Sequence, residues 1–257
     1  MAKRERSSEG KIVIYLDTVT NSVISKGISL TDFMHGIGNK RLPSALLLLN
    51  SKFDVANLNP HTKFSFIDEG EKTKALAIAL EKQTTAFSWL DFEEEEMLNQ
   101  LTGQEIAEIL YLGHRGTHLR SPFYYKLQNE YVYLTLDEGE RNKVYYRDIT
   151  RFYEMLAAVI TMRVNAVQHK KSLFGKIRPT RANKLPVGLI RTLRPLLKEG
   201  CVFDFGLSER TKTEVRIPII IKNSDDDSAS IFDEEMTEVN IEKWLTYSLK
   251  NDEWSLK

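Results

Sequence analysis

The sequence contains little cysteine and no long apolar run. Cys201 is the only cysteine among 257 residues, so neither an internal disulfide nor a cluster of thiolate metal ligands can form, which favours a reducing compartment. The longest apolar run, residues 155–162, is less than half of the roughly 20 residues that a membrane-spanning helix needs. The first ten residues are polar and lack the apolar core of a secretory signal. We therefore expect a cytoplasmic protein that has no membrane partner.

Acidic residues are missing from one long stretch. From Met155 to Lys198, 44 residues pass without an Asp or Glu, although ten of them are Lys or Arg. The whole chain has 36 basic and 36 acidic residues, and the acids gather elsewhere, with eleven in residues 68–108 and ten in 224–257. The basic segment, residues 163–198, is the predicted polyanion-binding site, and the cations assigned to it are Lys170, Lys171, Lys176, Arg178, Arg181, Lys184, Arg191, Arg194 and Lys198.

Two interpretations of the basic segment stay open. Lys and Arg bind nucleic acid by releasing the counterions of its phosphates, which favours a backbone contact. Phe174 is the only Phe, Tyr or Trp between Met155 and Lys198. This argues against a surface on which bases of a single strand stack. Alternatively, the acidic and basic blocks neutralise each other within the fold, or the charges simply solvate a surface. The end of the segment has the pattern of an amphipathic helix with a basic flank, which Pro195 is expected to kink or split.

The fold class predicted from residue patterns is α+β. After a disordered tail (1–10), a small N-terminal α/β region spans residues 11–96 and ends at an acidic run, residues 91–96. Alternation of apolar residues predicts its strands, and good helix formers or capping residues predict its helices. In chain order these are a strand at 11–17, a helix at 29–38, a strand at 62–68, a helix at 71–83 and a strand at 84–90.

A C-terminal α+β region is predicted over residues 97–257, with a long amphipathic helix and two β-hairpins. Thr102 and Glu105 have the spacing of a capping box, and Gly113 is predicted to end that helix. The remaining elements are a hairpin at 130–148, the long helix at 149–172, a hairpin at 201–221, an acidic mobile loop at 223–235 and a short helix at 239–249.

The candidate for anion chemistry is the stretch GHRGTHLRS, residues 113–121. Four of its side chains, His114, Arg115, His118 and Arg120, are assigned to an anion pocket. Basic residues near a helix C-terminus also stabilise the helix dipole without any further role. The stretch lacks the glutamate of the zinc-protease pattern, and no nucleotide-binding or nucleophile motif occurs in the chain. We expect no bound metal and no cofactor.

Residues 105–156 resemble a family of uncharacterised soluble proteins from spore-forming Gram-positive bacteria. The similar features are the EIAEILYLGH helix, the SPF turn, the hairpin that ends in NKVYY and the aromatic RFYEML helix. The resemblance implies a bacterial protein and no particular activity.

These patterns favour a non-enzymatic binding or regulatory protein. Its partner is a polyanion, most plausibly the backbone of nucleic acid, bound by the basic segment. One alternative is an adaptor whose acidic and basic blocks pair between proteins. A second is an enzyme that acts on a phosphorylated substrate through His114 and His118.

Overall fold

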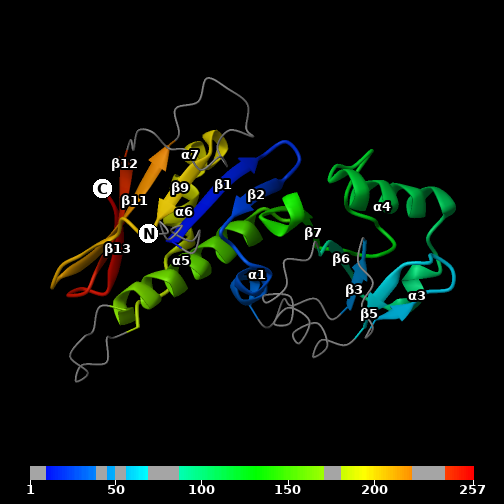
Figure 1. The fold of residues 1–257 in the computed structure, drawn as a ribbon, viewed down its shortest axis with the longest axis horizontal. Helices are drawn as coiled ribbons and strands as arrows, with labels where there is room; N and C mark the ends of the chain where they lie inside the picture. The colour runs from blue at the N-terminus through cyan, green and yellow to red at the C-terminus, as the bar shows by residue number, and fades with distance from the viewer. Residues whose placement is uncertain (1–9, 39–44, 50–55, 69–86, 171–180, 222–240) are drawn as a thin grey trace, which may run out of the picture. The chain divides into compact units, whose positions relative to one another are not determined.

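The structure is a computed structural model that describes residues 10–38, 45–49, 56–68, 87–170, 181–221 and 241–257 (Figure 1). The side chains of residues 168–170 lie outside this description. The predicted tail apart from Gly10, the helix predicted at 71–83 and the acidic loop predicted at 223–235 also lie outside the described residues. Within the described part of the chain, no helix is long and apolar enough to cross a membrane.

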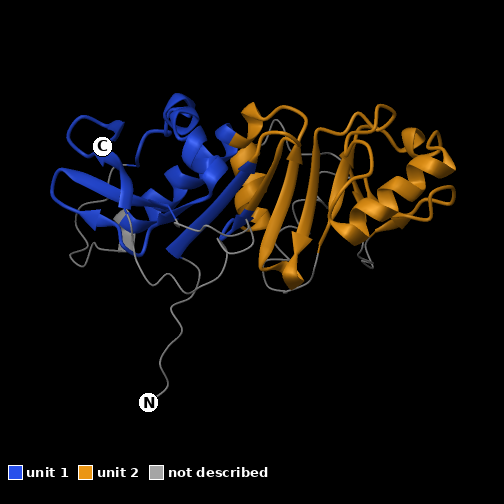
Figure 2. Cartoon of the chain, turned by 90° about the horizontal axis from the view of Figure 1, so that it is seen from above, with its two compact units in different colours: residues 1–16, 25–28, 153–257 blue, residues 17–24, 29–152 orange. Residues whose placement is uncertain are grey.

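The chain divides into two compact units (Figure 2). Unit 1 comprises residues 1–16, 25–28 and 153–257, and unit 2 comprises residues 17–24 and 29–152. Residues 91–96, where the acidic run suggests a boundary, lie within unit 2. Each unit is described by itself below.

Unit 1 combines antiparallel strands with three helices. Its strands pair in the order β1 (Lys11–Asp17), β9 (Cys201–Asp204), β11 (Glu214–Ile221), β12 (Ile241–Ser248) and β13 (Glu253–Leu256), and the short β10 (Glu209–Arg210) also pairs with β11. Its helices are α5 (Thr150–Lys170), of which the first three residues belong to unit 2, α6 (Val187–Thr192) and α7 (Arg194–Glu199).

The core of unit 1 follows the sequence periodicity. Along α5, apolar residues recur every three or four positions, which places them on one face of the helix. Leu156, Val159, Ile160 and Val164 on this face are fully buried. The long helix is therefore confirmed. Strand residues of the same unit are also buried, including Ile12, Ile14, Phe203, Ile217, Ile219 and Leu245.

Unit 2 contains short strands and three described helices. Its elements, in chain order, are α1 (Leu30–Ile37), β3 (Ala45–Leu48), β4 (Asn57–Leu58), β5 (Ser65–Ile67), β6 (Trp89–Phe92), α3 (Glu95–Leu98), α4 (Gly103–Arg115), β7 (Tyr131–Leu136), η3 (Asp137–Gly139) and β8 (Arg141–Tyr146). β2 (Ser22–Lys26) is shared between the units. The hairpin predicted at 130–148 is confirmed as β7 and β8, which pair from Tyr131 with Tyr146 to Leu136 with Arg141.

The predicted fold class is wrong. The described strands form a thirteen-stranded antiparallel sheet, in the order β13-β12-β11-β9-β1-β2-β8-β7-β6-β3-β5-β4 with β10 beside β11. A small α/β region followed by a long-helix region does not describe this arrangement. The residue patterns predicted elements one at a time, whereas strand pairing joins segments that are far apart in the sequence, such as β1 with β9.

The helix predicted at 239–249 is also wrong, because these residues form β12. Leu245, Thr246 and Tyr247 are all buried, and β12 pairs with a strand on each side, β11 and β13. A short apolar run fits both helical and strand periodicity, so the pairing of neighbouring strands decides between them.

Helix α4 begins as predicted and ends later. Thr102 and Glu105 form the capping box, in which the Thr102 hydroxyl accepts from the Glu105 amide at 3.2 Å. The predicted end at Gly113 is wrong, because the helix continues to Arg115 and Gly116 is the C-cap, with a left-handed φ of 65°. Gly113 is needed for packing instead, since a Cβ atom there would come within 2.8 Å of the Leu49 Cβ.

Two glycines in α4 provide a matched test of this packing. Gly113→Ala should destabilise the protein by about 1–3 kcal/mol, because a contact below 3.0 Å forces the backbone or Leu49 to shift. Gly103→Ala in the same helix has nothing within 4 Å of the added Cβ and should be neutral or stabilising by up to about 1 kcal/mol. Denaturant unfolding measures both, and equal effects of the two substitutions would contradict the described helix packing.

Candidate polyanion-binding surface

The basic surface is defined here by the cations of unit 1 whose side chains the structure describes: Arg181, Lys184, Arg191, Arg194 and Lys198. All five side chains are exposed. Lys170, Lys171, Lys176 and Arg178, which were predicted to belong to the same site, lie outside the described side chains.

Residues 181–185 run along α5 and are held there by two backbone hydrogen bonds. The Ala182 amide donates to the Asn165 side-chain oxygen at 2.8 Å, and the Leu185 amide donates to the Thr161 hydroxyl at 3.0 Å. Ala182 and Leu185 are buried, whereas Arg181 and Lys184 are exposed. Buried and exposed residues therefore divide this short segment into an anchored side and a cationic side.

The cations that follow are carried by α6 and α7. Pro195 stands at the start of α7, and the chain forms two short helices on either side of Leu193 instead of one helix, as the proline predicted. Ile190, Leu193 and Leu197 are fully buried. The opposite side of the two helices carries the three cations Arg191, Arg194 and Lys198, which are exposed.

Four of the five cations of the basic surface have no carboxylate partner among the described residues. Among the residues that the structure describes, no Asp or Glu lies in salt-bridge range of Arg181, Lys184, Arg194 or Lys198. Arg191 is engaged differently, with its guanidinium 6.0 Å from the centre of the Tyr153 ring. No described carboxylate therefore competes with an anionic ligand for these four cations.

No protein-family model, curated protein or solved structure matches this chain.

The four residues assigned to an anion pocket take different positions in unit 2. His114 and Arg115 are exposed in the last turn of α4, and the Arg120 Nε lies 3.6 Å from a Glu108 carboxylate oxygen. His118 packs edge-on against Tyr145, with ring centres 5.3 Å apart. Since α4 ends between the two histidines, they do not share a helix face, and their role in binding an anion or in an enzyme stays a prediction.

Three further observations limit the chemistry of the described residues. Burial and the nearby Lys143 ammonium lower the pKa of His118, which disfavours the charged form of its ring. The Cys201 thiol is fully buried, and burial raises its pKa to about 12, which makes it a structural residue rather than a nucleophile. No group of three His, Cys, Asp or Glu side chains within the described ranges could hold a metal ion.

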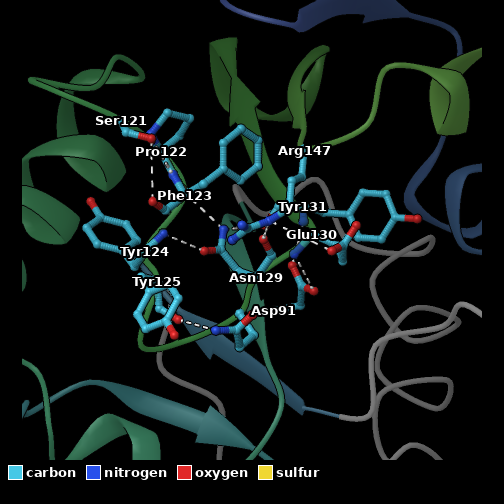
Figure 3. Close-up of polar contacts among 11 residues, drawn as sticks. Asp91, Ser121, Pro122, Phe123, Tyr124, Tyr125, Asn129, Glu130, Tyr131 and Arg147 are labelled. Atoms are coloured by element: carbon cyan, nitrogen blue, oxygen red, sulfur yellow. Dashed lines mark hydrogen bonds and ion pairs between the residues drawn. The ribbon is translucent and has the colours of Figure 1, made fainter.

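A buried polar network in unit 2 was missed by the sequence analysis (Figure 3). The two carboxylate oxygens of Asp91 accept from the backbone amides of Glu130 and Tyr131 at 2.9 and 2.7 Å. Asn129 is fully buried; its side-chain oxygen accepts from the Tyr124 amide at 2.8 Å. These bonds fix the loop before β7. The Tyr125 side chain of this loop is 84% exposed to solvent.

Arg147 completes the network from the end of β8. Its Nε donates to the Asn129 carbonyl at 2.7 Å, and its guanidinium lies 5.4 Å from the centre of the Phe123 ring. The partners are mostly backbone groups, so the arrangement holds a loop and leaves no reacting pair of side chains. The available sequence signal is Asp91 itself, a charged residue within the apolar strand WLDF at the start of the acidic run 91–96.

The buried carboxyl of Asp91 predicts a pH-dependent stability. Burial raises its pKa from 3.8 to about 7, although the two amide donors oppose the shift. Between these two pH values the unfolded chain has released a proton that the folded protein keeps, so the free energy of unfolding should fall as pH rises from about 4 to about 7. Above that range the contribution becomes constant.

Asp91→Asn should remove this part of the pH dependence, whatever its effect on stability at a single pH. The matched control is Asp68→Asn, which changes an exposed carboxylate of the same unit. Denaturant unfolding at a series of pH values gives the difference between wild type and each variant. A difference for Asp91→Asn that is level from pH 4 to pH 7 would show that the carboxyl titrates normally.

Proposed function

We propose that this protein binds a polyanion, and specifically the phosphate backbone of nucleic acid, through its basic surface. The observation that carries the proposal is that Arg181, Lys184, Arg194 and Lys198 are exposed and have no carboxylate partner among the described residues. Cations on a nucleic acid backbone gain affinity by releasing condensed counterions, and arginine can also grip a phosphate with two hydrogen bonds. In this proposal the protein is a cytoplasmic binding or regulatory protein and not an enzyme.

The distribution of charge between the units supports the proposal. Unit 1 holds 22 Lys and Arg against 17 Asp and Glu, whereas unit 2 holds 14 against 19. The neutral total is therefore the sum of a basic and an acidic unit, and the basic surface lies on the basic one. Steering of an anionic ligand depends on the local field more than on net charge.

An adaptor function is the second candidate. Glu93, Glu94, Glu95 and Glu96 are four consecutive exposed acids of unit 2, and no Lys or Arg in the described part of the chain lies in salt-bridge range of them. Such a run complements the basic surface of a second protein molecule. Molecular mass measured against ionic strength tests this candidate, which requires an oligomer at low salt that dissociates at high salt.

The polyanion proposal predicts a steep loss of affinity with salt. Binding of a short mixed-sequence DNA duplex, followed by fluorescence anisotropy, should weaken by orders of magnitude between about 50 and 200 mM salt. Reversing Lys184, Arg194 and Lys198 to Glu should weaken binding at low salt by orders of magnitude, and the affinity that remains should show a slope of log affinity against log salt reduced by about 3.

The matched control reverses Lys212, Lys243 and Lys250 to Glu. These lysines are also exposed and lie in unit 1, so the net charge changes by the same amount as in the test variant. This control should keep most of the affinity. Equal loss in both triple variants would mean that net charge alone governs binding, and wild-type binding that is insensitive to salt would remove the proposal.

A further inference from the structure

A second set of contacts holds the basic surface on its other side, through Asn183. The Asn183 side-chain amide donates to an Asp252 carboxylate oxygen, and the Asn183 carbonyl accepts from the Trp254 indole N–H at 2.8 Å. Asn183 lies between the cations Arg181 and Lys184, whereas Asp252 and Trp254 belong to the turn and strand that end unit 1. Residues about 70 positions apart in the sequence are thereby joined.

The acceptor carboxylate is itself held in place. Asp252 stands in the turn between β12 and β13 with a left-handed φ of 59°, and its amide donates to the Ser248 carbonyl at 2.9 Å. The Tyr247 hydroxyl donates to the same carboxylate. Burial and this hydrogen bond raise the pKa of Tyr247 to about 12, so the hydroxyl remains a donor at every physiological pH. Asn183 therefore meets a fixed partner.

We propose that Asn183 and Asp252 form a latch that fixes the cations of the basic surface before a ligand arrives, and that the ligand is double-stranded nucleic acid. This inference rests on the proposed function and adds the ligand class and a positioning residue to it. Three hydrogen bonds hold the segment that carries Arg181 and Lys184. The Ala182 and Leu185 amides donate to α5, and the Asn183 side chain donates to Asp252. A loop that is already ordered in the free protein loses little conformational entropy when the ligand binds.

The kind of nucleic acid follows from what the fixed segment presents. Residues 181–199 contain no aromatic residue, and single strands are bound largely by stacking bases on aromatic side chains. A duplex offers regularly spaced phosphates on a stiff backbone. Fixed cations match a stiff array of phosphates, whereas a flexible single strand must be ordered at each binding event.

Asn183→Ala tests the latch without changing any charge. Its affinity for a short mixed-sequence DNA duplex should fall about three- to tenfold, because the loop must then be ordered by the ligand. The salt slope should stay that of wild type, since the same phosphates are contacted. Hydrogen exchange of the Ala182 and Leu185 amides should become faster in the free variant, which a change in ligand contact alone would not cause.

Asn251→Ala is the matched control, because Asn251 is an exposed asparagine in the turn beside Asp252 and its side chain makes no hydrogen bond to the described residues. It should bind and exchange like wild type. If Asn183→Ala fails to fold, Trp254→Phe removes the indole donor to Asn183 while keeping an aromatic ring beside Tyr247, and it should show the same changes in smaller measure.

The outcomes separate this inference from the proposed function. Wild type that binds the duplex in a salt-dependent way, with both latch variants unchanged in affinity and exchange, keeps the proposed function and overturns the latch. Equal affinity of wild type for the duplex and for its separated single strand overturns the ligand class. Wild type that binds neither form overturns the proposed function and this inference with it.

Discussion

Two hydrogen bonds from Ala182 and Leu185 to α5 are the constraint on which the described part of the basic surface depends. The acceptors are the side chain of the partly buried Asn165 and the hydroxyl of Thr161, which is buried among apolar residues of the helix. Thr161 also donates to the Ala157 carbonyl at 2.7 Å, so its hydroxyl is satisfied in both directions. A segment rich in like charges would otherwise repel itself and remain extended. Here its backbone is tied to the core of unit 1 and its cations are directed to solvent.

The two units of this protein differ in their balance of charge. Unit 1 has more basic than acidic residues and unit 2 has more acidic than basic ones. Where cations outside the basic surface are described, several have carboxylate partners, such as Lys257 with Glu214 at 3.1 Å and Lys126 with Glu105 at 2.7 Å. The contrast with Lys184 and Lys198 supports a ligand-binding role for the basic surface.

Local patterns predicted many elements of the structure from the sequence. Helix α4 starts after the capping residue Thr102 as predicted, and the effect of Pro195 on the helix at the end of the basic segment was also predicted. In each case the signal and its consequence lie within a few residues. Such signals do not depend on how the rest of the chain folds.

Features that depend on distant partners were predicted less well. Residues 241–248 become a strand because β11 and β13 flank them, and Gly113 stays within a helix because Leu49 packs against it. The same limit applies to function. The cations of the basic surface are readable in the sequence, but Asn183, Asp252 and the buried Asp91 gain their roles from residues 39 or more positions away.

Chemical footprinting of lysines tests the central claim most directly. Acetylation of the free protein, read by mass spectrometry, should modify Lys184, Lys198, Lys212 and Lys243 readily, because all four are exposed. With a DNA duplex bound at low salt, Lys184 and Lys198 should become protected while Lys212 and Lys243 continue to react. If Lys184 and Lys198 are already unreactive in the free protein, or still react fully while the duplex is bound, then the basic surface is not the site of polyanion binding.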